Sequence, residues 1–248
     1  MRKLGLIGGT GAAAIVPRDA QERSLPETPW GSASGRVLEW RWGGVQVAYL
    51  ARHGASGDIA PHCVNYRANI WSLRHSGVDA VIGLNAVGGI STDCRPGRVV
   101  IPDQLIDYTW GRQHTYFDGT GEALRHIEFD PPFDAALRQS LLSAGARSGL
   151  DCLQRATYGV TQGPRLETAA EIDRLEADGC DVVGMTAMPE AGLAREAGLA
   201  YAICAVVVNR AAGRLPSGES IHGQLTAFAH HGMAGVAVLL QAVCVAAG

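Results

Sequence analysis

The sequence predicts an α/β fold in which helices flank a central mixed β-sheet. Apolar runs of strand length alternate along the chain with segments whose apolar residues recur at helical spacing, and no internal repeat interrupts this alternation. With 248 residues, 47% of them apolar, the chain can bury one sizeable core, and no composition break or long linker divides it. A single domain over residues 1–248 is therefore expected.

Glycines set the limits of the expected elements in the first half. Gly43-Gly44 separates two apolar runs and predicts a hairpin, and Gly77 ends a segment with helical spacing. The expected strands are 3–7, 37–42, 45–50, 79–84 and 98–101, and the expected helix is 64–75.

The second half continues the alternation. Leu137, Leu141 and Leu142 give helical spacing to the segment 133–146, and the last stretch, 225–246, is long and largely apolar. The remaining expected elements are helices at 168–177 and 189–197 and strands at 157–161, 182–185 and 201–208.

Charge and composition exclude several classes of partner. The formal net charge is -3, the pI is about 6.2, and Lys and Arg are scattered singly, so a nucleic-acid partner is not expected. The apolar residues after Met1-Arg2-Lys3 break at Gly8-Gly9-Thr10-Gly11 and Pro17, unlike a signal peptide or a membrane span. We expect a soluble cytoplasmic protein with no membrane partner.

The cysteines indicate neither a metal site nor a disulfide framework. There are 6 of them, widely spaced, with no Cys-x-x-Cys pair. Cys204 and others lie inside apolar runs, where a thiol behaves as a small buried apolar group.

Two glycine-containing segments at expected strand ends indicate an anion site. Arg52-His53-Gly54 follows the apolar run 45–51, and open α/β sheets bind ligands at the carboxyl ends of their strands. The Arg52 donor fork suits phosphate or carboxylate, and His53 adds an imidazole donor. After the first strand, Gly9-Thr10-Gly11 can bind one phosphate through backbone N–H groups and the Thr10 hydroxyl.

The same glycine loop also fits the dinucleotide-binding pattern G-x-G-x-x-G/A, so a Rossmann oxidoreductase is an alternative. That fold needs a crossover helix and a second strand after the loop. Pro17, Pro26 and Pro29 interrupt this span, which favours the single-phosphate interpretation.

Other small polar residues stand at expected strand ends. Asn85-Ala86 follows one strand, and Met185-Thr186 ends another. Together with Thr10 and Arg52-His53, they offer the hydroxyl, amide and cationic donors that a bound oxyanion requires.

Several separated segments carry a family resemblance, and chance agreement at so many ordered positions is remote. They are Gly8-Gly9-Thr10-Gly11, Ala51-Arg52-His53-Gly54, Val64-Asn65-Tyr66-Arg67-Ala68-Asn69-Ile70-Trp71, Asn85-Ala86-Val87-Gly88-Gly89, Gly163-Pro164-Arg165 with Glu167-Thr168, Gly184-Met185-Thr186 with Met188-Pro189-Glu190, and the Asn209 loop. On these segments the chain resembles, over nearly its whole length, the trimeric family of purine nucleoside phosphorylases and methylthioadenosine phosphorylases.

The resemblance implies phosphorolysis of a purine nucleoside, in which phosphate reaches the anomeric carbon while the C–N bond breaks through an oxocarbenium-like transition state. Arg52 would position phosphate beside the developing sugar cation. Inorganic phosphate would be a co-substrate, with no metal or organic cofactor, and a homotrimer is implied in which the segment 112–117 reaches a neighbour's pocket. Gly57 departs from the family, because many methylthioadenosine enzymes carry histidine there at the phosphate entrance. The implied phosphate-binding residues are Thr10, Arg52, His53, Asn85, Ala86 and Thr186, and Met185 would lie against the ribose.

Glu167 and Asn209 indicate a 6-oxopurine base. Methylthioadenosine phosphorylases resemble this chain but carry serine and aspartate at these positions, whereas the pair here is that of the 6-oxopurine enzymes. A carboxylate accepts the N1–H of hypoxanthine or guanine, while Asn209 can donate to O6 and accept from protonated N7. A mismatched buried acceptor costs roughly 1–3 kcal/mol, so adenosine-type substrates should be poor. The expected catalytic residues are Asn209, Glu167, Arg52 and His53, and Ala211 is a further expected substrate contact.

The expected 5' pocket lies within 220–226. The segment 185–191 resembles the methylthio branch of the family, which predicts S-methyl-5'-thioinosine as substrate and hypoxanthine and 5-methylthioribose 1-phosphate as products. Inosine or guanosine is the close alternative, and methylthioadenosine is a more distant one. Inosine-type enzymes bond the 5'-hydroxyl with a histidine, and His222 stands close to that position between Ile221 and Leu225. A surface histidine is the structural alternative.

Two other functions compete with phosphorolysis. A nucleosidase on a related sheet would use water, and Arg52 argues against it because hydrolysis needs no phosphate cradle. A catalytically silent nucleoside-binding protein would show affinity without turnover.

Overall fold

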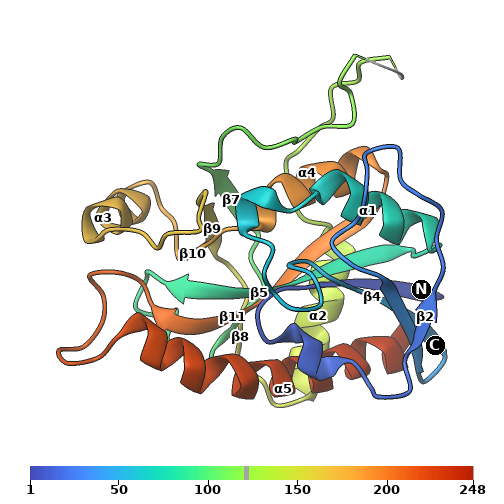
Figure 1. The fold of residues 1–248 in the computed structure, drawn as a ribbon. Helices are drawn as coiled ribbons and strands as arrows, with labels where there is room; N and C mark the ends of the chain where they lie inside the picture. Colours follow the sequence, from blue (N-terminus) through green and yellow to red (C-terminus); the bar gives the residue numbers. More distant parts are fainter. Residues whose placement is uncertain (120–122, 248) are drawn as a thin grey trace.

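A mixed β-sheet forms the centre of the protein, as the sequence predicts. The computed structural model describes residues 1–119 and 123–247 (Figure 1). Within these residues, an 11-stranded sheet has the order β2-β3-β4-β1-β5-β10-β9-β7, and β11 pairs with both β5 and β6, the latter of which pairs with β8. The strands are β1 (Lys3–Gly8), β2 (Gln21–Arg23), β3 (Val37–Trp42), β4 (Val45–Ala51), β5 (Ala80–Gly89), β6 (Val99–Val100), β7 (Gln104–Asp107), β8 (Cys152–Leu153), β9 (Thr157–Val160), β10 (Val182–Gly184) and β11 (Ala200–Arg210).

The middle strands bring their carboxyl ends to one edge of the sheet. β1 lies between β4 and β5 and runs parallel to both, so that Gly8 pairs with Ala51 on one side and with Leu84 on the other. β11 is parallel to β5 along its whole length. The loops that follow β1 and β4 therefore begin side by side.

Helices cover both faces of the sheet. Figure 1 shows α1 (Tyr66–His75) and α4 (Ala187–Glu196) on one face, and α2 (Ala135–Arg147) and α5 (Ile221–Ala247) on the other. α3 (Ala169–Ala177) lies beside β9 and β10 at one end. Separate apolar cores fill the two faces: Ile70 and Leu73 of α1 belong to one, and Leu141 of α2 and Leu240 of α5 to the other. The α/β class expected from the sequence is confirmed.

Two strands are longer than the sequence predicts. The expected strand 79–84 continues to Gly89, and the expected strand 201–208 continues to Arg210. The extension of β5 pairs with β11, from Asn85 with Ala205 to Gly89 with Arg210, across an irregularity between Val207 and Asn209. Asn85, Ala86 and Asn209 therefore lie within strands, not after them.

Three short strands, β2, β7 and β8, were not predicted from the sequence. β2 is exposed along its length, and β7 and β8 are partly exposed. In residues 1–119 and 123–247, no helix is long and apolar enough to cross a membrane. The same ranges contain no group of three or more His, Cys, Asp or Glu residues that could hold a metal ion.

Candidate active site

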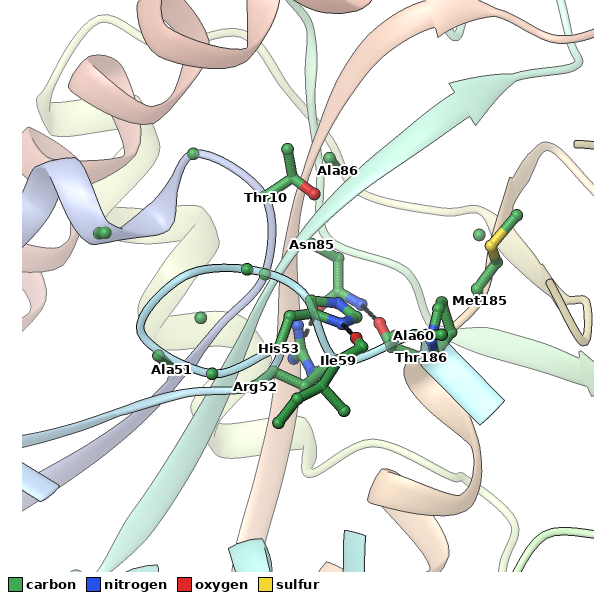
Figure 2. A pocket seen from close by; sticks show the side chains of 18 of the residues that line it. Thr10, Ala51, Arg52, His53, Ile59, Ala60, Asn85, Ala86, Met185 and Thr186 are labelled. Atoms are coloured by element: carbon green, nitrogen blue, oxygen red, sulfur yellow. Dashed lines mark hydrogen bonds between the residues drawn. The ribbon is translucent and has the colours of Figure 1, made fainter. Parts of the chain in front are cut away.

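A cavity of about 1080 Å³ opens where the central strands end, and it gathers nearly all of the predicted site residues. Strands β5 and β11, the loops after β1, β4, β9 and β10, the segment around β3 and the start of α5 supply its walls. The predicted residues that line it are Thr10, Arg52, His53, Asn85, Ala86, Glu167, Met185, Thr186, Asn209 and Ala211. Figure 2 shows how several of them converge on this space.

The glycine loop after β1 packs closely against its neighbours. A Cβ on Gly8 would lie 2.5 Å from the Tyr49 hydroxyl, and one on Gly9 would lie 2.9 Å from Arg52 Nη1. Gly11 has a φ of 80°, in the left-handed region that favours glycine. These glycines allow the backbone to bring Thr10 to the cavity.

The chain after this loop does not form a Rossmann unit. The 3-10 helix η1 (Ala12–Ile15) follows, and the next strand, β2, pairs antiparallel with β3. A dinucleotide site would need a full crossover helix leading to a parallel strand.

Arg52 lies behind the cavity wall with its donor fork already occupied. Its side chain is 0% exposed, Nε donates to Glu190 Oε2 at 2.7 Å, and Nη2 donates to Glu190 Oε1 at 2.8 Å. Nη1 donates to Leu84 O at 3.1 Å and Nη2 to Ile7 O at 3.1 Å. The expectation that the fork faces an anion in the cavity is thus corrected, because a buried carboxylate takes it. A guanidinium has five N–H donors, so a second Nη1 hydrogen beside Gly9 is left for a ligand.

His53 is held as a neutral ring. Its Nδ1 lies 2.8 Å from Ile59 O, and because a carbonyl only accepts, Nδ1 carries the hydrogen. Burial, followed by the nearby Arg52 charge, lowers the pKa of His53 below its ordinary value. The remaining ring nitrogen, Nε2, is then an acceptor, whereas the sequence suggested a donor.

Asn85 and Thr186 meet because of strand register. β10 runs antiparallel to β5, with Val182 opposite Gly89 and Val183 opposite Gly88. Continuing that register brings Thr186 opposite Asn85, and Asn85 Nδ2 donates to Thr186 Oγ1 at 2.8 Å (Figure 2). Both side chains are buried at the cavity wall.

Hydrogen bonds to neighbouring groups orient both expected base-binding side chains, Glu167 and Asn209. The Thr161 hydroxyl donates to Glu167 Oε1 at 2.6 Å. Asn209 Nδ2 donates to Arg210 O at 2.8 Å, so one amide hydrogen is used within the chain and the other is left for a ligand. The sequence contains no signal for the role of Thr161, because only the fold brings it to Glu167.

His222 does not join the other predicted residues. It is exposed, and the residues of α5 that the cavity lining includes are Ile221 and Leu225. Residues four apart share a helix face, whereas the next residue along points elsewhere. The expected histidine contact is therefore replaced by two apolar side chains.

Arg112 stabilises the cavity wall of its own chain. It is 8% exposed, and Nη1 donates to Met185 O at 2.8 Å and to Met188 O at 2.7 Å, while Nη2 donates to Gln162 O at 2.8 Å. The donors of Arg112 are taken within the chain, and the expectation that residues 112–117 reach a neighbour's pocket stays a prediction.

Comparisons with known proteins agree with this geometry. A family model described as the phosphorylase superfamily matches residues 3–243. A probable S-methyl-5'-thioinosine phosphorylase from Pseudomonas syringae pv. tomato is 48% identical, over 86% of this chain and 87% of that protein. A 6-oxopurine nucleoside phosphorylase from Pyrococcus furiosus is 41% identical, over 86% of this chain and 81% of that protein. The structure of methylthioadenosine phosphorylase from Schistosoma mansoni in complex with adenine superposes with a TM-score of 0.91 at 30% identity, covering 100% of this chain and 92% of that one.

Proposed function

The chain belongs to the phosphorylase superfamily, and we propose that it cleaves the N-glycosidic bond of S-methyl-5'-thioinosine with inorganic phosphate. The products are hypoxanthine and 5-methylthioribose 1-phosphate. The observation that carries this proposal is one cavity that combines Glu167 and Asn209 with the apolar pair Ile221 and Leu225.

Phosphate is proposed to lie between the glycine loop and the β5–β10 pair. A phosphate oxygen forms the bond to C1' of the sugar, and the electron pair of the C1'–N9 bond leaves with the purine. The proton that hydrogen phosphate gives up as it becomes the sugar phosphate balances the one that the purine takes at N7. Thr10, Ala86 and Thr186 offer hydroxyl and peptide donors, and neutral His53 offers an acceptor for the P–OH group of hydrogen phosphate. Such fixed groups position the nucleophile beside the developing sugar cation, and no cofactor is needed.

The proposed preference for hypoxanthine over adenine rests on the Glu167 carboxylate and the Asn209 amide. The Thr161 hydroxyl donates to one oxygen of Glu167, which supports the use of the other oxygen as acceptor for the N1–H of hypoxanthine. Adenine has no N1–H, so it would leave that oxygen unpaired. The remaining Asn209 groups suit O6 and protonated N7.

The proposed preference for a methylthio group at the 5' position of the nucleoside rests on two residues of α5. Ile221 and Leu225 favour an apolar methylthio group over a hydroxyl, which would lose its hydrogen bonds to water on entering such a site. Inosine or guanosine phosphorolysis is the second candidate, supported by the 41% identity to a 6-oxopurine nucleoside phosphorylase.

A kcat/KM panel of S-methyl-5'-thioinosine, inosine, guanosine and methylthioadenosine, each with and without phosphate, tests the proposal. We expect phosphate-dependent turnover that is highest for S-methyl-5'-thioinosine, by about tenfold or more over methylthioadenosine. Equal base release without phosphate would indicate a nucleosidase, binding without turnover a silent binder, and a preference for adenine would overturn the roles of Glu167 and Asn209.

The proposal includes assembly into a homotrimer. Supporting it, Trp110 is 73% exposed and Leu166 is 40% exposed. Exposed large apolar side chains that gather into one patch mark surfaces that bind other chains.

A further inference from the structure

A buried polar network continues from the cavity wall into the core. Glu190, in α4, is 0% exposed and pairs through both carboxylate oxygens with Arg52 at the end of β4, at 2.7 and 2.8 Å. The Tyr201 hydroxyl also donates to Glu190 Oε1 at 2.7 Å, and burial raises the pKa of Tyr201 well above its ordinary value, which keeps the phenol protonated. A Cβ on Gly83 would collide with the Tyr201 hydroxyl, so this glycine leaves room for the contact.

The donor and acceptor of the hydrogen bonds in this network follow from the two charged groups, Glu190 and Arg52. A carboxylate only accepts and a guanidinium only donates, so Arg52 is the donor toward every partner, and its two Nη2 hydrogens are shared among Glu190 Oε1, Ile7 O and Asn85 Oδ1. Arg52 Nη2 lies 3.5 Å from Asn85 Oδ1, which places the oxygen of that amide toward Arg52 and its nitrogen toward Thr186. Thr186 Oγ1 then accepts from Asn85 Nδ2 (Figure 2), which leaves the Thr186 hydrogen for another acceptor: the neighbouring Tyr158 hydroxyl or an anion at the cavity wall.

The Arg52–Glu190 ion pair also determines the net charge that the cavity wall presents to an anion. Burial by itself lowers the pKa of Arg52, but the Glu190 charge and hydrogen bonds raise it above its ordinary value, so the cation is retained. Its charge is balanced at contact distance by Glu190. An oxyanion in the cavity would therefore be held by oriented hydroxyl and N–H groups more than by a free cation.

We propose that Glu190 is a positioning residue for the oxyanion subsite: it holds Arg52 in the orientation that turns the Asn85 amide, and through Asn85 it directs the Thr186 hydroxyl hydrogen to the anion. The identification of that anion as phosphate rests on the proposed function.

Glu190→Gln tests the role. Glutamine has one acceptor oxygen where the carboxylate has two, so its NH₂ group must face Arg52 or Tyr201, and the network loses its direction. We expect the Kd of inorganic phosphate, measured by titration calorimetry in phosphate-free buffer, and the KM of phosphate to rise by about tenfold, equivalent to about 1.4 kcal/mol. The KM of the nucleoside should stay within about twofold. Unchanged phosphate affinity would overturn the proposal.

Glu196→Gln is the matched control. Glu196 lies on the same helix and accepts from Thr115 Oγ1 and Tyr116 N, both at 2.7 Å, outside the cavity lining. We expect its phosphate Kd to equal that of the wild type. An equal loss in both variants would indicate a general effect on α4 and would count against positioning by Glu190.

A double variant, Arg52→Met with Glu190→Leu, covers the case in which Glu190→Gln does not fold. Replacing a buried ion pair by apolar residues is often neutral or stabilising, so this protein should fold while lacking the network. We expect its phosphate Kd to rise at least as much as that of the single variant. Wild-type phosphate affinity in the double variant would overturn the proposal.

Failure of the proposed function gives a different result. If wild-type protein shows no phosphate-dependent turnover, the proposed function is wrong. If wild-type protein turns over and Glu190→Gln keeps the wild-type phosphate KM, only the positioning role is wrong.

Discussion

At the residue scale, the hydroxyl of Thr161 is expected to determine how Glu167 meets the base. The hydrogen bond between them is 2.6 Å long and fixes one carboxylate oxygen. Thr161→Val keeps the side-chain shape and removes that donor, so the carboxylate can turn away from N1–H. We expect kcat/KM for S-methyl-5'-thioinosine to fall by about tenfold, with a smaller loss for methylthioadenosine.

Thr115→Val is the control for this substitution, because Thr115 Oγ1 donates to Glu196 at 2.7 Å outside the cavity lining. It removes a similar threonine–glutamate bond and should leave the ratio of the two substrates unchanged. An unchanged ratio in Thr161→Val as well would contradict the orienting role.

Residue types at the site were predictable, but their partners were not. Thr10, Asn85 and Thr186 could be gathered from sequence because each stands at or just after the end of an expected strand. The partner of Arg52 could not, because Glu190 lies 138 residues further along the chain and only the packing of α4 brings it to β4. The sequence therefore predicted the cation and missed the carboxylate that balances it.

At the scale of elements, Arg112 joins the start of α4 to the turn after β9. It donates to Met185 O, Met188 O and Gln162 O, and those carbonyls would lose their partner in Arg112→Met. We expect the free energy of unfolding, measured by urea denaturation, to fall by about 2–4 kcal/mol, because several part-buried acceptors lose their partner together with the packing of a buried side chain.

Arg214→Met provides the comparison. Arg214 pairs with Asp173 and Glu176, whose side chains are 65% and 52% exposed, and exposed ion pairs contribute about 0–1 kcal/mol. Equal losses in the two variants would contradict the structural role of Arg112.

Element ends were the least predictable part of the fold. Gly88 and Gly89 have low strand propensity, and Asn209 and Arg210 read as a loop start. They are strand residues because β5 and β11 pair with each other along this extension. Pairing partners far apart in sequence decide such ends, whereas β3 and β4 match their expected ranges closely because a two-glycine turn joins them.

At the scale of the whole molecule, an exposed apolar surface gives the proposed homotrimer its test. Trp110 is 73% exposed and lines a hollow of about 370 Å³ together with Arg165 and Glu171. A neighbouring chain that covers this surface would remove the Trp110 side chain from water, which stabilises association. We expect light scattering on a sizing column to give three times the 26.0 kDa chain mass for wild-type protein, and a smaller mass for Trp110→Asp at the same concentration. Val245→Asp is the control, because Val245 is 70% exposed but lies near the end of α5 and outside both hollows, so its variant should keep the wild-type mass. A wild-type mass of one chain would overturn the homotrimer, and a Trp110→Asp mass equal to that of the wild type would place the contact elsewhere on the surface.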